Sequence, residues 1–245
     1  MDPAGRHALV TGGGSGIGAA IAAALRDAGA GVTVVGRRRS DAPGYQQADV
    51  TDGASIRAAV ARAETALGPI AILVNNAGAA ESAPFVRTSR AIWDRMLAVN
   101  LTGTFEATQA LLPAMVGRGW GRVINVASTA GLTGYPYVAA YVAAKHGVVG
   151  LTRALALETA KSQVTVNALC PGYTETALLT DSFAAIMAKT GKSEAEVRRD
   201  FSKSNPQGRL VQPDEVAAAV LWLCRPGSDA VTGQAIAIAG GEVLH

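Results

Sequence analysis

The stretch TGGGSGIG, residues 11 to 18, decides the fold of this 245-residue chain. It follows an apolar run, HALVT at 7 to 11, and opens a segment with apolar residues at helical spacing. Glycines let the backbone turn tightly and approach a pyrophosphate, while a helix N-terminus supplies free N–H groups and a favourable dipole. A strand, a glycine loop and a helix in this order predict a dinucleotide-binding site.

Apolar runs alternate with helical patterns along the rest of the chain. The further runs that we expect to form strands are 31–36, 70–76, 121–128, 164–172 and 235–241. The expected helices lie near 17–28, 54–67, 89–117, 141–160 and 213–224. Apolar strands that alternate with helices are typical of a parallel sheet covered on both faces. No linker or repeat divides the chain, so we expect one α/β domain over 1–245, with a Rossmann-like doubly wound parallel sheet in three layers.

Two segments depart from this alternation. The connection from Arg37 to Asp49 is too short for a long crossover helix and contains SDAPG, so we expect a loop or a single helical turn. Residues 177–206 contain helical pieces on a long insertion after the fifth expected strand. Because ligands bind at the carboxyl ends of the strands in such sheets, this insertion is well placed to form a substrate-binding lid.

Composition and charge exclude several classes of protein. Hydrophobic residues make up 49% of the chain and charged residues 17%, which indicates a folded rather than a disordered chain. The only dense basic run, Arg37 to Arg39, is too compact to track a nucleic-acid groove. No apolar run approaches the roughly 18 residues of a membrane span, and the N-terminus lacks a signal-peptide pattern. Cys170 and Cys224 lack metal-ligand spacing. We therefore expect a cytoplasmic protein without a metal site, a nucleic-acid partner or membrane contact.

The spacing of the glycines differs from the GxGxxG fingerprint. Gly12-x-x-x-Gly16-x-Gly18 is the TGxxxGxG variant of the short-chain dehydrogenase/reductase family, which the sequence resembles over essentially its whole length. The other motifs follow in the order of that family: DV at 49–50, NNAG at 75–78, Asn100 in VNLTG, Ser128, Tyr141 with Lys145, and PGYTET at 171–176. The resemblance implies an oxidoreductase that moves a hydride between a nicotinamide cofactor and a carbonyl or secondary alcohol.

The end of the second expected strand favours NADP(H) over NAD(H). A carboxylate there would bind the adenosine ribose and repel a 2′-phosphate, but this sequence has Gly36 followed by Arg37. An arginine suits the 2′-phosphate through charge-assisted hydrogen bonds. The alternative, a solvated arginine loop, leaves NAD(H) possible. The glycine loop would contribute Gly12, Ser15, Gly16, Ile17 and Gly18 to the cofactor site. By resemblance, the other cofactor residues are Asp49, Val50, Asn76, Gly78, Tyr141, Lys145, Pro171, Gly172, Thr174 and Thr176.

Tyr141 and Lys145 are four residues apart, so on a helix they share a face. We expect Tyr141 to be the acid/base and Lys145 to tune its pKa and bind the ribose. A free tyrosine has a pKa near 10, which is too high for an efficient base at neutral pH, and a nearby ammonium group lowers this pKa. Ser128 lies thirteen residues before Tyr141, as in the family, where its hydroxyl would bind the substrate carbonyl. By resemblance, Asn100 supports a water that relays protons through the lysine; the alternative is a capping or kink residue. We expect Tyr135 to line the substrate pocket.

The stretch from 139 to 173 resembles bacterial 3-hydroxybutyrate dehydrogenases, and the Arg37 loop resembles NADPH-dependent 3-oxoacyl-thioester reductases. The expected substrate is therefore a 3-oxoacyl or 3-hydroxyacyl compound, either a small molecule or an acyl thioester such as an acetoacetyl compound. One alternative is a dehydrogenase of cyclic, aromatic or sugar alcohols, and another is a non-catalytic protein that binds or senses NADP. The resemblance also implies a homotetramer or a homodimer.

Overall fold

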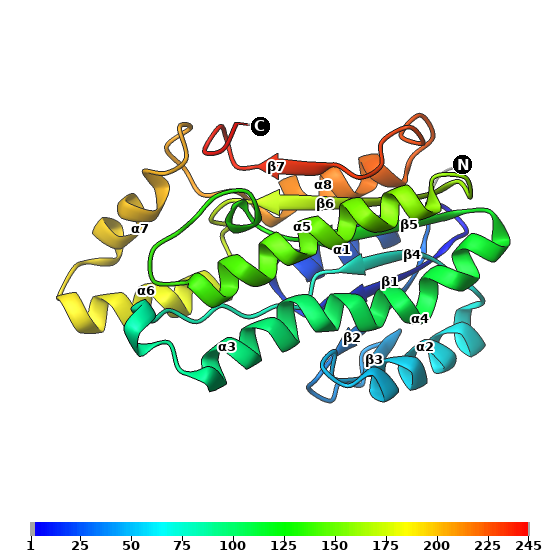
Figure 1. Ribbon diagram of the computed structural model, residues 1–245, viewed down its shortest axis with the longest axis horizontal. Helices are drawn as coiled ribbons and strands as arrows, with labels where there is room; N and C mark the ends of the chain where they lie inside the picture. Colours follow the sequence, from blue (N-terminus) through cyan, green and yellow to red (C-terminus); the bar gives the residue numbers. More distant parts are fainter. Residues whose placement is uncertain (1–2, 245) are drawn as a thin grey trace.

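The computed structural model describes residues 3–244, and its central element is a seven-stranded sheet in the order β3-β2-β1-β4-β5-β6-β7 (Figure 1). All neighbouring strands pair in parallel. The strands are β1 (His7–Thr11), β2 (Gly31–Gly36), β3 (Tyr45–Gln47), β4 (Ile70–Asn75), β5 (Gly121–Val126), β6 (Val164–Pro171) and β7 (Ala235–Ile238). This order confirms the predicted doubly wound parallel sheet, whose strand order reverses between β1 and β4.

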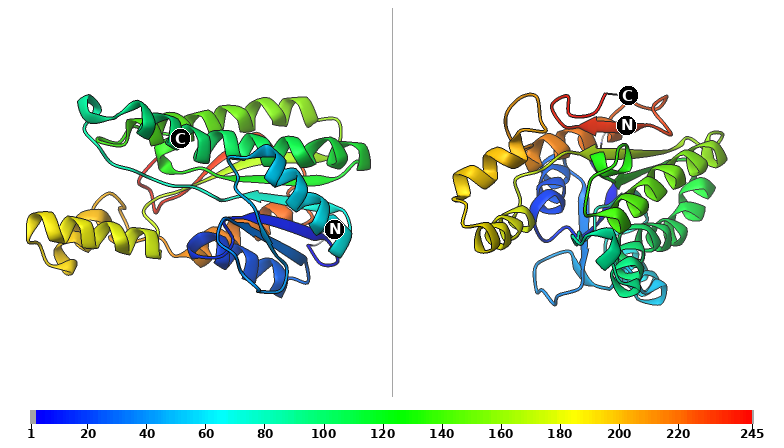
Figure 2. Two further views of the ribbon diagram at one scale, coloured as in Figure 1. Left: turned by 90° about the horizontal axis from the view of Figure 1, so that it is seen from below. Right: turned by 60° about the vertical axis from the view of Figure 1, so that its left-hand side comes forward.

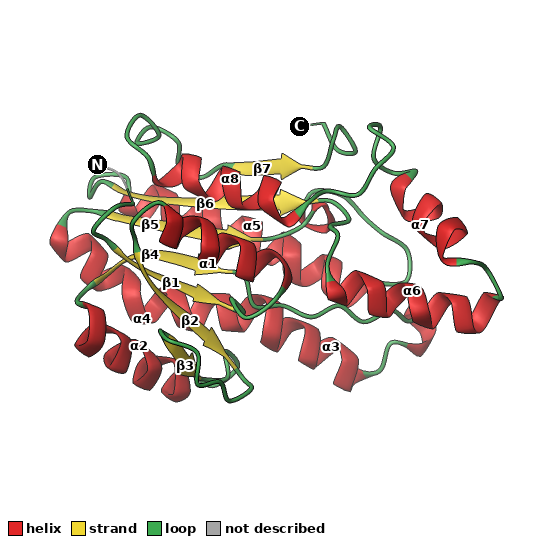
Figure 3. Ribbon diagram, turned by 180° about the vertical axis from the view of Figure 1, so that it is seen from behind, coloured by secondary structure: helices red, strands yellow, loops and turns green. Residues whose placement is uncertain are grey.

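Helices cover both faces of the sheet. Figure 1 looks onto the face covered by α4 and α5, and Figure 3 onto the opposite face, where α1 and α8 pack together. The helices are α1 (Gly16–Asp27), α2 (Gly53–Leu67), α3 (Arg90–Leu97), α4 (Gly103–Arg118), α5 (Ala139–Thr159), α6 (Ala177–Thr190), α7 (Glu194–Ser202) and α8 (Pro213–Cys224). Three short turns are η1 (Phe85–Arg87), the π-helical η2 (Ala98–Thr102) and η3 (Thr129–Gly131). Among the residues described, no helix has the length and apolar character needed to cross a bilayer.

The core lies in two layers, one on each side of the sheet. Along β1, Ala8 and Val10 join the cluster under α1 and α8, whereas Leu9 joins the cluster under α2 and α4. This alternation follows from the two-residue period of a strand. Because both faces are covered, the central strands are apolar almost throughout, which is why the sequence located them so well.

The connection after β2 is the expected loop, but it leads into a strand that the sequence did not predict. Residues 37–44 form a loop without a helical turn, and the chain then enters β3, an edge strand that pairs with β2. The sequence does not predict β3, because Tyr45, Gln46 and Gln47 are half-buried or exposed and carry no apolar run.

The segment expected to be one helix over 89–117 is three elements. A π-helical turn, η2, separates α3 from α4, and Asn100 lies fully buried within it. Such turns insert an extra residue into a helix and are frequent at functional sites.

Residues 177–206 contain α6 and α7, which extend beyond the carboxyl ends of the strands (Figure 2). Phe183 from α6 and Val197 from α7 are buried against Leu210, which gives this segment a small apolar cluster of its own. Ser193 and Glu196 form a capping box at the start of α7.

Candidate active site

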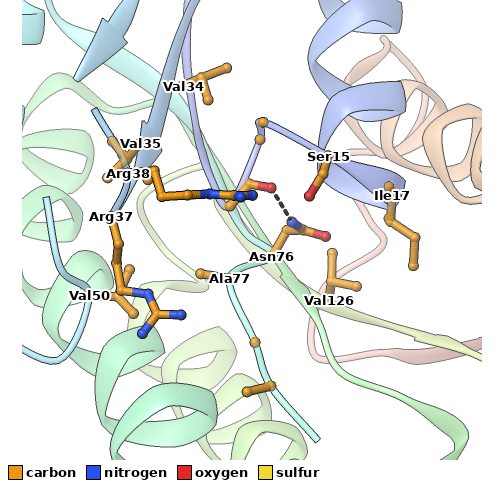
Figure 4. Close-up of a pocket in the computed structure, with 18 of the residues that line it drawn as sticks. Ser15, Ile17, Val34, Val35, Arg37, Arg38, Val50, Asn76, Ala77 and Val126 are labelled. Carbon is orange, nitrogen blue, oxygen red and sulfur yellow. Dashed lines mark hydrogen bonds between the residues drawn. The ribbon is translucent and has the colours of Figure 1, made fainter. Parts of the chain in front are cut away.

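A cleft of about 1150 Å³ opens at the carboxyl ends of the strands (Figure 4). This volume is ample for a dinucleotide. The cleft brings together most of the residues predicted from the sequence: Gly12, Ser15, Gly16, Ile17, Gly18, Arg37, Asp49, Val50, Asn76, Gly78, Asn100, Tyr141, Lys145 and Thr176.

The backbone conformation and close packing of the glycine loop require glycine, and the absence of side chains leaves space for a dinucleotide. Gly12 and Gly16 have φ of +66° and +50°, the left-handed region that favours glycine. A Cβ on Gly18 would lie 2.4 Å from both Asn76 Nδ2 and the Gly12 carbonyl oxygen. Asn76 Nδ2 donates to the carbonyls of Thr11 and Gly12 at 3.1 and 3.2 Å, which fixes the loop against β4. The N-terminus of α1 therefore opens into the cleft with space for a pyrophosphate.

The loop after β2 brings arginines to the far end of the cleft. Figure 4 shows Arg37 and Arg38 directed into it, and Arg39 also lines it. The main chain of this loop is held in place, because Tyr45 Oη donates to Arg38 O at 2.6 Å and Gln47 Nε2 donates to Arg37 O at 3.0 Å. The sequence suggests that the run of three arginines can hold a phosphate but names only Arg37 as a cofactor residue, whereas all three arginines line the cleft.

Position 36 has little space for the acidic residue that would favour NAD(H). A Cβ on Gly36 would lie 2.3 Å from Tyr45 Oη, so any side chain there must displace the tyrosine hydroxyl. Nearby, Asp49 accepts from Thr51 N at 2.9 Å and Thr51 Oγ1 at 2.8 Å. These bonds, the first of them above all, lower the pKa of the Asp49 carboxyl. Asp49 therefore lies in the cleft as an acceptor.

Ser128, Tyr141 and Lys145 converge beside the cleft. Ser128 caps η3, where its Oγ accepts from Ala130 N at 3.1 Å, and its hydroxyl lies close enough to Tyr141 to lower the pKa of that phenol. Lys145 Nζ lies 5.6 Å from the centroid of the Tyr141 ring and donates to Val126 O at 2.9 Å. The first turns of α5 thus place a phenol and an ammonium group on one face, next to a serine hydroxyl.

Burial controls the ionisation of this group. It raises the pKa of Tyr141, and the hydrogen bond from Ser128 offsets only part of the rise. Burial also lowers the pKa of Lys145 to about 8. The expected lowering of the Tyr141 pKa by Lys145 is not found in this structure, where burial has the largest effect on the phenol and the Lys145 Nζ donates to the Val126 carbonyl.

Asn100 faces Lys145 across Gly78. A Cβ on Gly78 would lie 2.9 Å from Asn100 Oδ1 and 3.8 Å from Lys145 Nζ. Asn100 Nδ2 donates to Ala79 O at 2.8 Å and Met96 O at 2.9 Å, and Oδ1 accepts from Ala79 N at 3.2 Å. The side chain thus anchors the segment after β4 to the π-helical turn, so the structural role holds and the proton relay stays a prediction.

Of the cofactor residues predicted in the segment 171–176, only Thr176 lines the cleft. Thr176 caps α6, and its Cγ2 lies 3.1 Å from the position of a Cβ on Gly16, so it borders the glycine loop. Pro171, Gly172 and Thr174 lie beside the cleft rather than in its lining. Thr174 is buried, and its hydroxyl donates to Gly172 O at 2.9 Å.

Tyr135 also lies outside the cofactor cleft, on the side of Ser128. Its hydroxyl donates to Glu242 Oε1 at 2.5 Å and is 2.8 Å from Thr129 Oγ1. Sequence reasoning missed Glu242, because no local pattern shows that the tail after β7 folds back to this loop.

We predict a pH-dependent stability effect of Lys145→Met. The pKa of Lys145 is about 8 in the folded chain, against a usual 10.5, so between these values the unfolded state binds more protons and the stability of the native protein rises with pH. The methionine variant is expected to be more stable than the native protein at pH 7. The difference in free energy of unfolding between the variant and the native protein should fall by about 3 kcal/mol between pH 7 and pH 10.5. Urea unfolding across this range measures it, with exposed Lys161→Met as the control; an advantage that stays constant contradicts the prediction.

Comparisons with known proteins agree with these observations. The sequence model of the short chain dehydrogenase family matches residues 6–186. D-beta-hydroxybutyrate dehydrogenase of Cupriavidus necator is 40% identical over 98% of this chain and 99% of its own length. Acetoacetyl-CoA reductase of Rhizobium meliloti is 38% identical over 97% and 98%. A crystal structure of a variant of actinorhodin polyketide ketoreductase with NADPH has a TM-score of 0.91 and 38% identity, with 97% of each chain covered. The chain therefore belongs to the short-chain dehydrogenase family of oxidoreductases.

Proposed function

We propose that this protein reduces the carbonyl group of 3-oxoacyl compounds to 3-hydroxyacyl compounds, with NADP(H) preferred over NAD(H). The observation that carries the proposal is the convergence of Ser128, Tyr141 and Lys145 beside a cleft that begins at the glycine loop. The substrate class is supported by full-length relatives named for 3-hydroxybutyrate and acetoacetyl-CoA. The protein would act on a small molecule or on an acyl thioester.

The bound cofactor would supply the hydride, and the chain itself would manage the proton. Ser128 would donate a hydrogen bond to the substrate carbonyl, and Tyr141 would give its phenol proton to the oxygen as charge develops there. Because burial raises the pKa of Tyr141, the phenol stays protonated at neutral pH, which is the form that carbonyl reduction requires. Lys145 would hold the ribose and, when charged, stabilise the phenolate that remains. Asn100 would support a proton relay that restores the phenol.

The preference for NADP(H) is supported by charge and by space. Arg37 and Arg38 lie at the far end of the cleft, where guanidinium groups suit a 2′-phosphate. Gly36 offers no carboxylate to bind a ribose, and Tyr45 limits the space for one.

A substrate screen tests the proposal. We expect NADPH-dependent reduction of acetoacetyl-CoA and ethyl acetoacetate with kcat/KM more than roughly tenfold above that for cyclohexanone and aromatic ketones. Faster turnover of cyclic, aromatic or sugar substrates would favour the alternative dehydrogenase. Cofactor binding without turnover of any carbonyl compound would favour a non-catalytic binding or sensing protein.

We also propose that the protein assembles into a homotetramer or homodimer through α4 and α5. A shallow apolar groove of about 180 Å³ between these helices is lined by Phe105, Leu112, Leu151 and Leu155, among others. Leu157 is 81% exposed on the same helix, α5. Covering apolar side chains of this size with a partner subunit removes them from water and stabilises the assembly. Light scattering, which gives the mass in solution, tests this proposal. A cytoplasmic location stays a prediction of the sequence.

A further inference from the structure

Glu242 places a carboxylate against Tyr135, whose hydroxyl also contacts Thr129, the residue after Ser128. Glu242 lies in the tail after β7, which Figure 1 shows near the loop that joins β5 to α5. The hydroxyl of Tyr135 donates to Glu242 Oε1 at 2.5 Å and is 2.8 Å from Thr129 Oγ1. Thr129 directly follows Ser128, so two hydrogen bonds connect this carboxylate to the residue beside the serine hydroxyl.

The other carboxylate oxygen faces the end of β6. A Cβ on Gly172 would lie 2.7 Å from Glu242 Oε2. The next residue, Tyr173, contacts Tyr135 edge to face, with ring centroids 6.3 Å apart. Glu242 therefore lies where the loop that follows Ser128 meets the end of β6, beside the tyrosine that is expected to line the substrate pocket.

The charge of Glu242 acts on the aromatic side chains around it. Burial raises the pKa of Tyr135 and of Tyr173, and the carboxylate of Glu242 raises both further. Tyr173 in turn contributes to the raised pKa of Tyr141. Tyr135, which is expected to line the substrate pocket, is thus within electrostatic range of this carboxylate.

No cation neutralises the carboxylate among residues 3–244, where Glu242 forms none of the ion pairs found. Two basic side chains of the segment 177–206 are paired elsewhere. Arg198 binds Glu175, and Lys203 binds Asp200 at 2.7 Å. The negative charge of Glu242 is therefore not compensated by an ion pair within this part of the chain and can repel an anionic ligand that binds beside it.

We propose that Glu242 is a specificity-determining residue that disfavours substrates with a free carboxylate and so directs the enzyme to ester or thioester forms of 3-oxoacyl compounds. The inference rests on the proposed function and deepens it. Two carboxylates in a partly desolvated site repel each other, whereas a neutral ester or thioester carbonyl does not. This preference would separate the chain from the relative named for 3-hydroxybutyrate, a free acid.

Acetoacetate and ethyl acetoacetate form a matched pair that tests this, because they share the reacting ketone and differ in charge. The measured quantity is kcat/KM for acetoacetate divided by kcat/KM for the ester. We expect the native protein to prefer the ester, and Glu242→Gln to raise the ratio about tenfold, which corresponds to about 1.4 kcal/mol. A glutamine oxygen still accepts from Tyr135, so the local fold is preserved. Glu158→Gln, on the exposed far end of α5, is the control and should leave the ratio unchanged.

A second measurement needs no variant. Salt screens a partly buried pair only weakly, so a higher ionic strength should raise the ratio of the native protein by less than Glu242→Gln does. Turnover of the ester with a ratio that Glu242→Gln leaves unchanged overturns the inference and leaves the proposed function intact, as does a native preference for acetoacetate. If neither compound is reduced while cyclic ketones are, the proposed function fails and the inference fails with it.

Discussion

Tyr141→Phe is expected to lower kcat for carbonyl reduction about 10³-fold. A positioned general acid contributes roughly 10²- to 10⁴-fold, and this substitution removes the phenol proton while it keeps the ring that packs at the start of α5. Because Lys145 and the glycine loop are unchanged, the dissociation constant for NADPH should shift only a few-fold. Steady-state kinetics and isothermal titration calorimetry measure the two quantities separately.

Tyr137→Phe is the matched control for this loss. Tyr137 is a second phenol close in sequence, 63% exposed, and its removal should leave turnover within about twofold because no proton transfer is assigned to it. Tyr141→Phe with more than a tenth of native turnover would show that another group supplies the proton. A large loss in both variants would point to disturbance of the loop rather than to proton transfer.

The central strands of the sheet could be predicted from the sequence because each of them is a local run of apolar residues. The strands β1 and β2 begin and end at the expected residues, since strands buried on both faces must be apolar throughout. The edge strand β3 escaped detection because one neighbour and partial exposure impose no such pattern. The π-helical turn at Asn100 also escaped, because its extra residue is fixed by bonds to Ala79, which lies 21 residues away.

The candidate site divides in the same way. The motif positions in the glycine loop and on α5 could be predicted from their spacing together with the family order of the motifs, because one loop and one helix turn set their local geometry. Glu242 contacts Tyr135, which is 107 residues away in the sequence, and Tyr45 contacts Gly36 only because the unpredicted strand β3 pairs with β2. The pKa of Tyr141 is likewise a property of burial, which the pair of residues 141 and 145 does not reveal.

Arg37→Asp is expected to reverse the cofactor preference. Loss of a charge-assisted hydrogen bond to the 2′-phosphate costs about 2 kcal/mol, and the new carboxylate repels the phosphate but accepts hydrogen bonds from a ribose. Together these effects should lower the ratio of kcat/KM for NADPH to kcat/KM for NADH about 10³-fold. Position 37 is the better site for this change than position 36, because a side chain on Gly36 would collide with the Tyr45 hydroxyl, which holds the Arg38 carbonyl.

The neighbouring arginine decides how complete the reversal is. Arg38 also reaches the cleft, so it would keep part of the attraction for the 2′-phosphate in the single variant, and Arg37→Asp with Arg38→Ala should favour NADH further. Arg225→Asp makes the same charge change on an exposed residue just after α8. It should leave the ratio within about twofold, because Arg225 is not among the residues that line the cleft. Equal kcat/KM for both cofactors in the native protein, or an unchanged ratio in Arg37→Asp, would place the arginines in a solvated loop without a role in cofactor choice.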